Sequence, residues 1–203
     1  MRQTRPPEVS LTAEVPVYGA GRYALILPLP SEIGAALSAQ MDGVPGATVP
    51  PLGYHVTVLG PFIFRTDPQA GLSLLRRTLL TTTPFAVRLQ RLGYFRRQGE
   101  NVLFLHVDGG AELLRLHNRL LAELGDLIVD RHPRGEDWDL RQYTPHVSLG
   151  LHIPDATLDA ALRQLGNLRL DYTLEVRELW LLRETSEIPV AWVLAESYHL
   201  AEA

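Results

Sequence analysis

The chain contains no cysteine and no lysine, and each absence excludes particular chemistry. Without cysteine there is no disulfide, no thiolate zinc site and no cysteine nucleophile. All 19 basic residues are arginine, so the chain offers no lysine for a Schiff base, a P-loop or a covalent lysyl-nucleotide. ATP-dependent ligases of the lysyl-nucleotide type are therefore excluded. A GC-rich genome explains the all-arginine composition more simply than phosphate binding does.

Long apolar runs are also missing. No segment approaches the roughly eighteen apolar residues of a membrane span, and the first residues lack the apolar centre of a signal peptide. We therefore expect a cytoplasmic protein with no membrane partner. The net charge of −4 argues against broad coating of nucleic acid, which needs a basic surface, but permits a small phosphate pocket.

One short pattern occurs twice: a histidine, an apolar residue, a hydroxyl residue and another apolar residue. The first copy is His-Val-Thr-Val at 55–58, and the second is His-Val-Ser-Leu at 146–149. Each copy is typical of a strand, in which alternate side chains share one face about 6.6 Å apart. One phosphate could contact both members of a pair, His55 with Thr57 or His146 with Ser148.

The two copies occupy the same step of a repeated order of elements: strand, helix, motif strand, helix, strand. In the first half we expect strands at 22–27, 54–59 and 85–95 and helices at 31–41 and from 68. In the second half we expect strands at 102–105, 146–151, 169–183 and 190–197, and helices at 113–125 and from 155. Ser31 and Asp67 are the expected helix N-caps, and Gly60-Pro61 should end the first motif strand.

This order predicts an α+β fold: two pseudo-symmetric lobes from a duplicated β-α-β-α-β unit, with antiparallel-rich sheets lining a central cleft. We expect a single bilobal domain at 22–197, with lobes at about 22–96 and 101–197. An N-terminal extension, 1–21, precedes it and a tail, 198–203, follows. An approximate twofold axis would bring the two motif strands together.

Such a site suits acid/base chemistry on a phosphodiester. Hydrolysis needs one base to activate water, one acid to protonate the departing oxygen, and donors to the phosphoryl oxygens. Imidazole titrates near pH 6.5, so neutral and protonated histidines coexist at neutral pH. We therefore predict that His55 and His146 are the base and the acid, in an order that the sequence does not assign. Thr57 and Ser148 are predicted to orient the phosphoryl oxygens.

Metal ligation is the competing use of histidine. His146 and His152 are six residues apart, roughly 20 Å along a strand, which is too far to share an ion. A metal site could be assembled from other acidic and histidine residues only by assuming that the fold brings them together. These residues are Asp108, Asp130, His106, His117 and His132. We expect no metal and no cofactor, with His106 and His117 structural and His132 and His199 solvated.

The two motif segments resemble the two signatures of the two-histidine (2H) phosphoesterase superfamily, which includes 2'-5' RNA ligases and cyclic nucleotide phosphodiesterases. His-Val-Thr-Val-Leu-Gly-Pro-Phe, 55–62, is similar to the first signature of bacterial members, and Thr-Pro-His-Val-Ser-Leu, 144–149, to the second. The resemblance covers length, motif spacing and element order over about 22–197. The N-terminal extension departs from it, because members often begin close to the first strand.

Three further features are candidates for contact with the substrate. Arg96 and Arg183 hold matching positions in the two halves, where they could bind phosphate or remain solvated at strand ends. Tyr23 opens the first strand, where family members often carry an aromatic residue near the substrate, so it could stack on a base or pack in the core. The charged loop at 126–142 has the length of a lid and equally suits a solvated insertion.

The resemblance therefore implies a cyclic phosphodiesterase or 2'-5' RNA ligase-like hydrolase with a role in RNA processing. Its expected partners are RNA ends or a small nucleotide with a cyclic phosphate, and no obligatory protein partner is evident. The physiological substrate and the direction of reaction stay open. The alternative is a noncatalytic RNA-end or nucleotide-binding module with the same fold. Intact histidine and hydroxyl pairs count against it, because binding alone does not need both imidazoles.

Overall fold

The computed structural model describes residues 21–96, 99–130, 143–166, 171–185 and 191–201. The strands in these residues are β1 (Tyr23–Pro28), β2 (His55–Phe64), β3 (Phe85–Phe95), β4 (Asn101–Asp108), β5 (Ile128–Asp130), β6 (His146–Ile153), β7 (Asp171–Val176), β8 (Glu178–Glu184) and β9 (Trp192–His199). The α-helices are α1 (Ser31–Met41), α2 (Pro68–Leu80), α3 (Gly110–Leu124) and α4 (Asp155–Gly166), and a 3-10 turn, Gly125–Leu127, follows α3.

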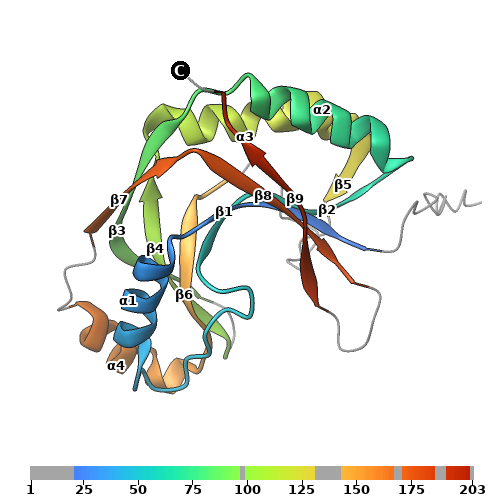
Figure 1. Ribbon diagram of the computed structural model, residues 1–203. Helices are drawn as coiled ribbons and strands as arrows, with labels where there is room; N and C mark the ends of the chain where they lie inside the picture. Colours follow the sequence, from blue (N-terminus) through green and yellow to red (C-terminus); the bar gives the residue numbers. More distant parts are fainter. Residues whose placement is uncertain (1–20, 97–98, 131–142, 167–170, 186–190, 202–203) are drawn as a thin grey trace, which may run out of the picture.

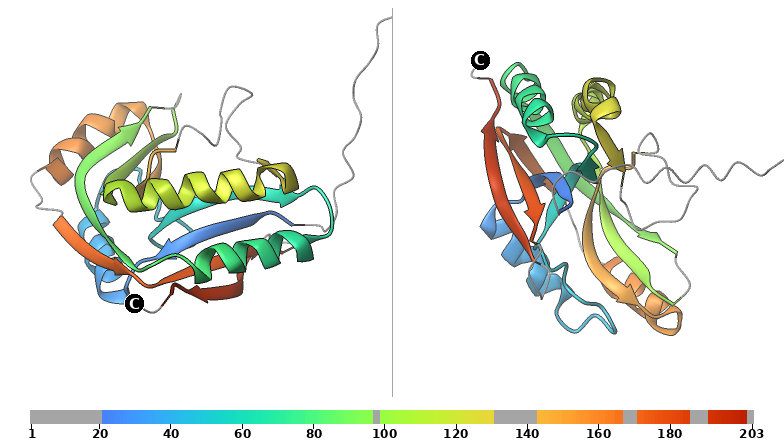
Figure 2. Two further views of the ribbon diagram at one scale, coloured as in Figure 1. Left: turned by 90° about the horizontal axis from the view of Figure 1, so that it is seen from above. Right: turned by 90° about the vertical axis from the view of Figure 1, so that its right-hand side faces the viewer.

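The strands form a curled antiparallel sheet in the order β7-β3-β4-β6-β2-β1-β8-β9, and β5 pairs with the end of β2. Helices α2 and α3 lie side by side over the outer face of the sheet (Figure 1; Figure 2). Helices α1 and α4 lie at the lower edge of the molecule in Figure 1, away from α2 and α3. The architecture is therefore mixed α+β with an antiparallel sheet, which confirms the predicted fold class.

Two halves of the sheet meet between β2 and β6. One half contains β1, β2, β8 and β9, and the other contains β3, β4, β6 and β7. A single pair of opposed residues, Val56 and Val147, joins the two halves. Both side chains are fully buried and belong to the main hydrophobic core. The two motif strands are therefore the central strands of the molecule.

The pairing of the outer strands differs from the sequence-based expectation. Strand β3, from the first half of the chain, pairs with β4 and β7. The strand expected at 169–183 is divided at Arg177 into β7, next to β3, and β8, next to β1. Each half of the sheet thus combines strands from both expected lobes, 22–96 and 101–197. Side-chain alternation identifies a strand and its buried face but not its partner, which explains the difference.

Two local expectations about element ends are wrong and one is confirmed. Ser31 is the first residue of α1 rather than its N-cap; the cap position is Pro30, and the Ser31 hydroxyl donates to Glu32. Asp67 does cap α2, because its carboxylate accepts a hydrogen bond from the Gln69 N–H at 3.1 Å. Strand β2 continues through Gly60-Pro61 to Phe64. The β1–β2 register shifts at this point, which interrupts the regular hydrogen-bond ladder. Pro61, which has no N–H to donate, is therefore tolerated within the strand.

The predicted loop at 126–142 is structured in its first part. Residues 126–127 belong to the 3-10 turn, and 128–130 form β5, which extends the sheet beside β2. The remainder, with Arg131, His132, Arg134, Trp138 and Arg141, lies outside the described residues, as does the N-terminal extension up to residue 20. Within the described part of the chain, no helix is long and apolar enough to cross a membrane.

Candidate active site

The antiparallel pair β2–β6 brings the two motifs together. Val56 lies directly opposite Val147, so the flanking positions in this register place His55 opposite Ser148 and Thr57 opposite His146. Since Val56 and Val147 point into the core, the residues on either side of them point to the inner face of the sheet. The structure therefore gathers all four predicted catalytic residues on one face.

The register also places the two histidines at opposite corners of this group. Diagonal neighbours in a regular antiparallel pair are on the order of 7–8 Å apart. A tetrahedral phosphate between His55 and His146 would have one imidazole on each side. The hydroxyls of Thr57 and Ser148 occupy the other two corners.

Both histidine rings are held by the same kind of hydrogen bond. Nδ1 of His55 lies 3.0 Å from the carbonyl oxygen of Gly53, and Nδ1 of His146 lies 2.7 Å from that of Thr144. A carbonyl oxygen only accepts, so the hydrogen is on Nδ1 in each ring. Nε2 is therefore the nitrogen that gains or loses a proton in both motifs.

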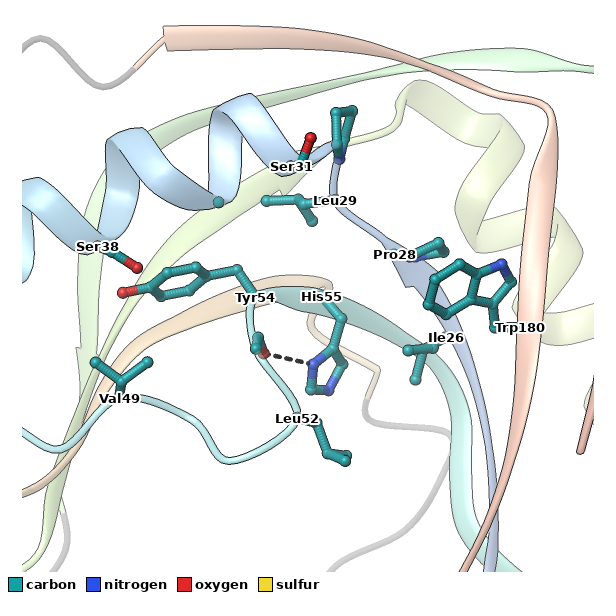
Figure 3. Close-up of a pocket in the computed structure, with 13 residues that line it drawn as sticks. Ile26, Pro28, Leu29, Ser31, Ser38, Val49, Leu52, Tyr54, His55 and Trp180 are labelled. Carbon is teal, nitrogen blue, oxygen red and sulfur yellow. Dashed lines mark hydrogen bonds between the residues drawn. The ribbon is translucent and has the colours of Figure 1, made fainter. Parts of the chain in front are cut away.

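The surroundings of His55 favour its neutral form. Burial lowers the pKa of its imidazole below the usual value, and the hydrogen bond to Gly53 offsets part of this effect. Apolar side chains of Ile26, Leu52 and Trp180 flank the ring (Figure 3). Desolvation disfavours the charged imidazolium, so His55 is suited to accept a proton.

Two aromatic side chains contact the ring of His146. Its ring centroid lies 5.0 Å from that of Phe95 and 5.3 Å from that of Phe104. These two phenyl rings stack on each other, with centroids 4.2 Å apart. They hold the imidazole in place from the side of β3 and β4.

A pocket of about 300 Å³ opens beside His55. Strand β8 contributes Trp180, and helix α1 contributes the hydroxyls of Ser31 and Ser38 (Figure 3). The rest of its lining is mainly apolar: Ile26, Pro28, Leu29, Pro30, Gly34, Val49, Leu52, Gly53 and Tyr54. A planar organic group attached to a phosphate at His55 would find an apolar surface here.

Two of the other predicted substrate-binding residues, Tyr23 and Arg183, lie on the opposite face of the sheet from these four. The ring of Tyr23 packs against Phe62 and Phe64, at centroid distances of 6.0 and 5.1 Å, so it packs with the core rather than beside the histidines. Arg183 lies directly opposite Tyr23 and shares that face of the sheet. Arg96 is exposed and directly follows β3, next to Phe95.

A third histidine lies beside the group, although the sequence led us to expect it only as a structural residue. His106 on β4 lies directly opposite His146. Its pKa is lowered by burial and by the nearby charge of Arg91. The signal was the β4–β6 register, which a single sequence does not contain. His117 is buried and His199 is exposed, and no cluster of three potential metal ligands occurs in the described ranges.

Comparisons with known proteins identify the family and the fold. The family model of the 2'-5' RNA ligase superfamily matches residues 44–187. Among solved structures, TT0787 of Thermus thermophilus is 22% identical, with a TM-score of 0.62 over 90% of this chain and 100% of that one. Apo LigT of E. coli is 16% identical, with a TM-score of 0.65 over 90% and 98%.

A more distant likeness is Usb1 of Kluyveromyces marxianus, 15% identical, with a TM-score of 0.50 over 86% of this chain and 97% of that one. No curated protein sequence matches significantly. At these identities the solved structures show a shared fold.

Proposed function

The chain belongs to the 2'-5' RNA ligase superfamily, and we propose that it is a metal-independent phosphoesterase. Its proposed substrates are a 2',3'-cyclic phosphate or a 2'-5' phosphodiester of RNA or a nucleotide. The observation that carries this proposal is the opposition of Val56 and Val147, which places two histidines and two hydroxyls on one face.

In the proposed reaction, His55 is the base and His146 is the acid. Neutral Nε2 of His55 takes a proton from water as the water oxygen bonds to phosphorus. The P–O bond to the 2' or 3' oxygen breaks, and Nε2–H of protonated His146 supplies the proton to that oxygen. Because the two rings are diagonal neighbours, they suit attack and departure on opposite sides of phosphorus. Solvent then restores both protonation states.

Thr57 and Ser148 are the proposed ligands of the nonbridging oxygens. Their hydroxyls share a face with the two imidazoles, and donors aimed at developing charge lower the barrier. Replacing water by a 5'-hydroxyl in the same site would form a 2'-5' linkage from a cyclic phosphate without ATP. Hydrolysis and ligation are therefore the same displacement at phosphorus with two different nucleophiles.

A nucleotide is the proposed substrate class, because the phosphate site adjoins the apolar pocket beside His55. LigT of E. coli has been solved with 3'-AMP and with phosphate. In this chain, Trp180 offers the aromatic ring on which a base could stack.

The alternative function is a noncatalytic nucleotide or RNA-end binding module. The two are separated by assaying 2',3'-cyclic nucleotides, 2'-5' dinucleotides and ADP-ribose cyclic phosphate with and without EDTA. We expect turnover of at least one substrate at the same rate with EDTA. Binding without turnover would support the alternative, and loss of turnover with EDTA would contradict a metal-independent mechanism.

A further inference from the structure

One tyrosine connects the two motifs. Tyr143 lies three residues before His146, on the segment that leads into β6. Its hydroxyl donates to the backbone carbonyl oxygen of Thr57 on β2, at 3.0 Å. The lead-in to the second motif is therefore bonded to the backbone of the first.

A histidine on helix α3 completes this connection. His117 is 1% exposed, and its Nδ1 donates to the carbonyl oxygen of Val58 at 2.8 Å. Its ring stacks on that of Tyr143, with centroids 3.9 Å apart and planes 11° from parallel. One stacked pair thus donates to two consecutive carbonyls of β2.

These two carbonyls lie where the sheet is irregular. In the β1–β2 ladder, Ile26 opposes Thr57 and the next pair is Leu25 with Leu59, so Val58 is the extra residue of a bulge. On the other side, β2 and β6 share a single opposed pair, at Val56. Backbone groups at such a place need other partners, and bulges re-aim nearby side chains.

We propose that Tyr143 and His117 form a positioning pair that fixes the β2 bulge and holds His55 and Thr57 in register with His146. This inference rests on the proposed function of the four motif residues. Neither member is assigned to contact substrate; both act through the backbone of β2.

Burial supports this role for the tyrosine hydroxyl. Desolvation raises the pKa of Tyr143 well above its ordinary value. The phenol therefore keeps its proton, and stays a donor to Thr57, across the range in which the enzyme is assayed.

The first test is Tyr143→Phe, which removes the hydroxyl and keeps the stacked ring. We expect kcat to fall roughly tenfold, because small misplacements of reacting groups are costly, and KM to rise by no more than the dissociation constant of phosphate does. The matched control is Tyr198→Phe: Tyr198 is buried on β9, and its hydroxyl donates to Glu196 at 2.8 Å. Removing the Tyr198 hydroxyl should leave kcat unchanged.

A double-mutant cycle separates positioning from general loss of structure. If Tyr143 acts by positioning both motif residues of β2, Tyr143→Phe should lower kcat less in a Thr57→Ala background than in the wild type, because one of the two residues that it positions has then lost its hydroxyl. His117→Asn, which retains an N–H donor, should restore most of the kcat lost in His117→Leu. Fully additive losses, equal losses in Tyr198→Phe, or an unchanged kcat in Tyr143→Phe would overturn the inference.

Binding of inorganic phosphate provides a measurement independent of turnover. We expect Tyr143→Phe, but not Tyr198→Phe, to raise the dissociation constant of phosphate severalfold. If the wild-type protein turns over no phosphodiester, the proposed function fails, and this comparison still tests the positioning pair. Equal phosphate affinity in both variants would contradict it.

Discussion

His55 and His146 are oriented by equivalent hydrogen bonds, from Nδ1 of each ring to the carbonyl oxygen two residues earlier. The equivalence of the two motifs therefore extends from the sequence to the direction of each Nε2. Their surroundings differ, because an apolar pocket adjoins His55 whereas Phe95 and Phe104 contact His146. Different surroundings allow two identical side chains to take different roles in one reaction.

The pH dependence of kcat/KM tests the role of His55. Burial lowers the pKa of its imidazole, so as pH falls His55 should keep its neutral, proton-accepting form below pH 6.5, the usual imidazole value. We expect the acid limb of the profile to lie below that pH. Leu52→Asn should make the pocket more polar and move this limb upward.

Val49→Asn is the matched control for that shift. Val49 lines the same pocket but is 53% exposed, so its replacement should change the solvation of His55 little. An acid limb that stays in place in Leu52→Asn, or that moves equally in both variants, would argue against desolvation as its cause.

The two motif hydroxyls should contribute to the transition state rather than to substrate binding. Thr57→Val and Ser148→Ala each remove one donor near the phosphoryl oxygens, so kcat should fall roughly 100-fold in each. Steady-state kinetics distinguish this loss of kcat from a change in KM. Thr82→Val provides the control, because that hydroxyl bonds to the Thr78 carbonyl after helix α2. A change confined to KM would assign the hydroxyls to binding alone.

Trp180 should select for nucleotides. A stacked base contributes about 1–3 kcal/mol, so Trp180→Leu should raise KM for a 2',3'-cyclic nucleotide by roughly 5- to 150-fold. KM for glycerol cyclic phosphate, which has no base, should stay the same. Trp192→Leu is the comparison, since Trp192 lies on β9 with the Arg22 guanidinium 5.8 Å from its ring. Equal changes in KM for both substrates would show that the base does not bind in this pocket.

The motif strands were predictable from sequence because they depend on local alternation. His55 and Thr57 share a face wherever β2 pairs, and a duplicated order was enough to place the second motif beside the first. The exchange of β3 for β8 and β9 between the halves of the sheet was not predictable, because alternation does not specify a partner strand.

Side-chain roles that depend on distant neighbours were missed for the same reason. The sequence allowed two interpretations of Tyr23, stacking on a nucleotide base or packing in the core. Its contacts with Phe62 and Phe64 show that it packs in the core. His117 was expected to be structural, but its bond to the motif strand depends on how α3 crosses β2. No local pattern contains that crossing.

The most direct test of the central claim is the turnover of His55→Ala and His146→Ala on the best substrate of the panel. We expect kcat/KM to fall at least roughly 100-fold in each, the lower end of a general acid or base contribution, with unchanged thermal unfolding. His199→Ala, at an exposed position on β9, should retain wild-type turnover. Full turnover in either motif variant would contradict the account.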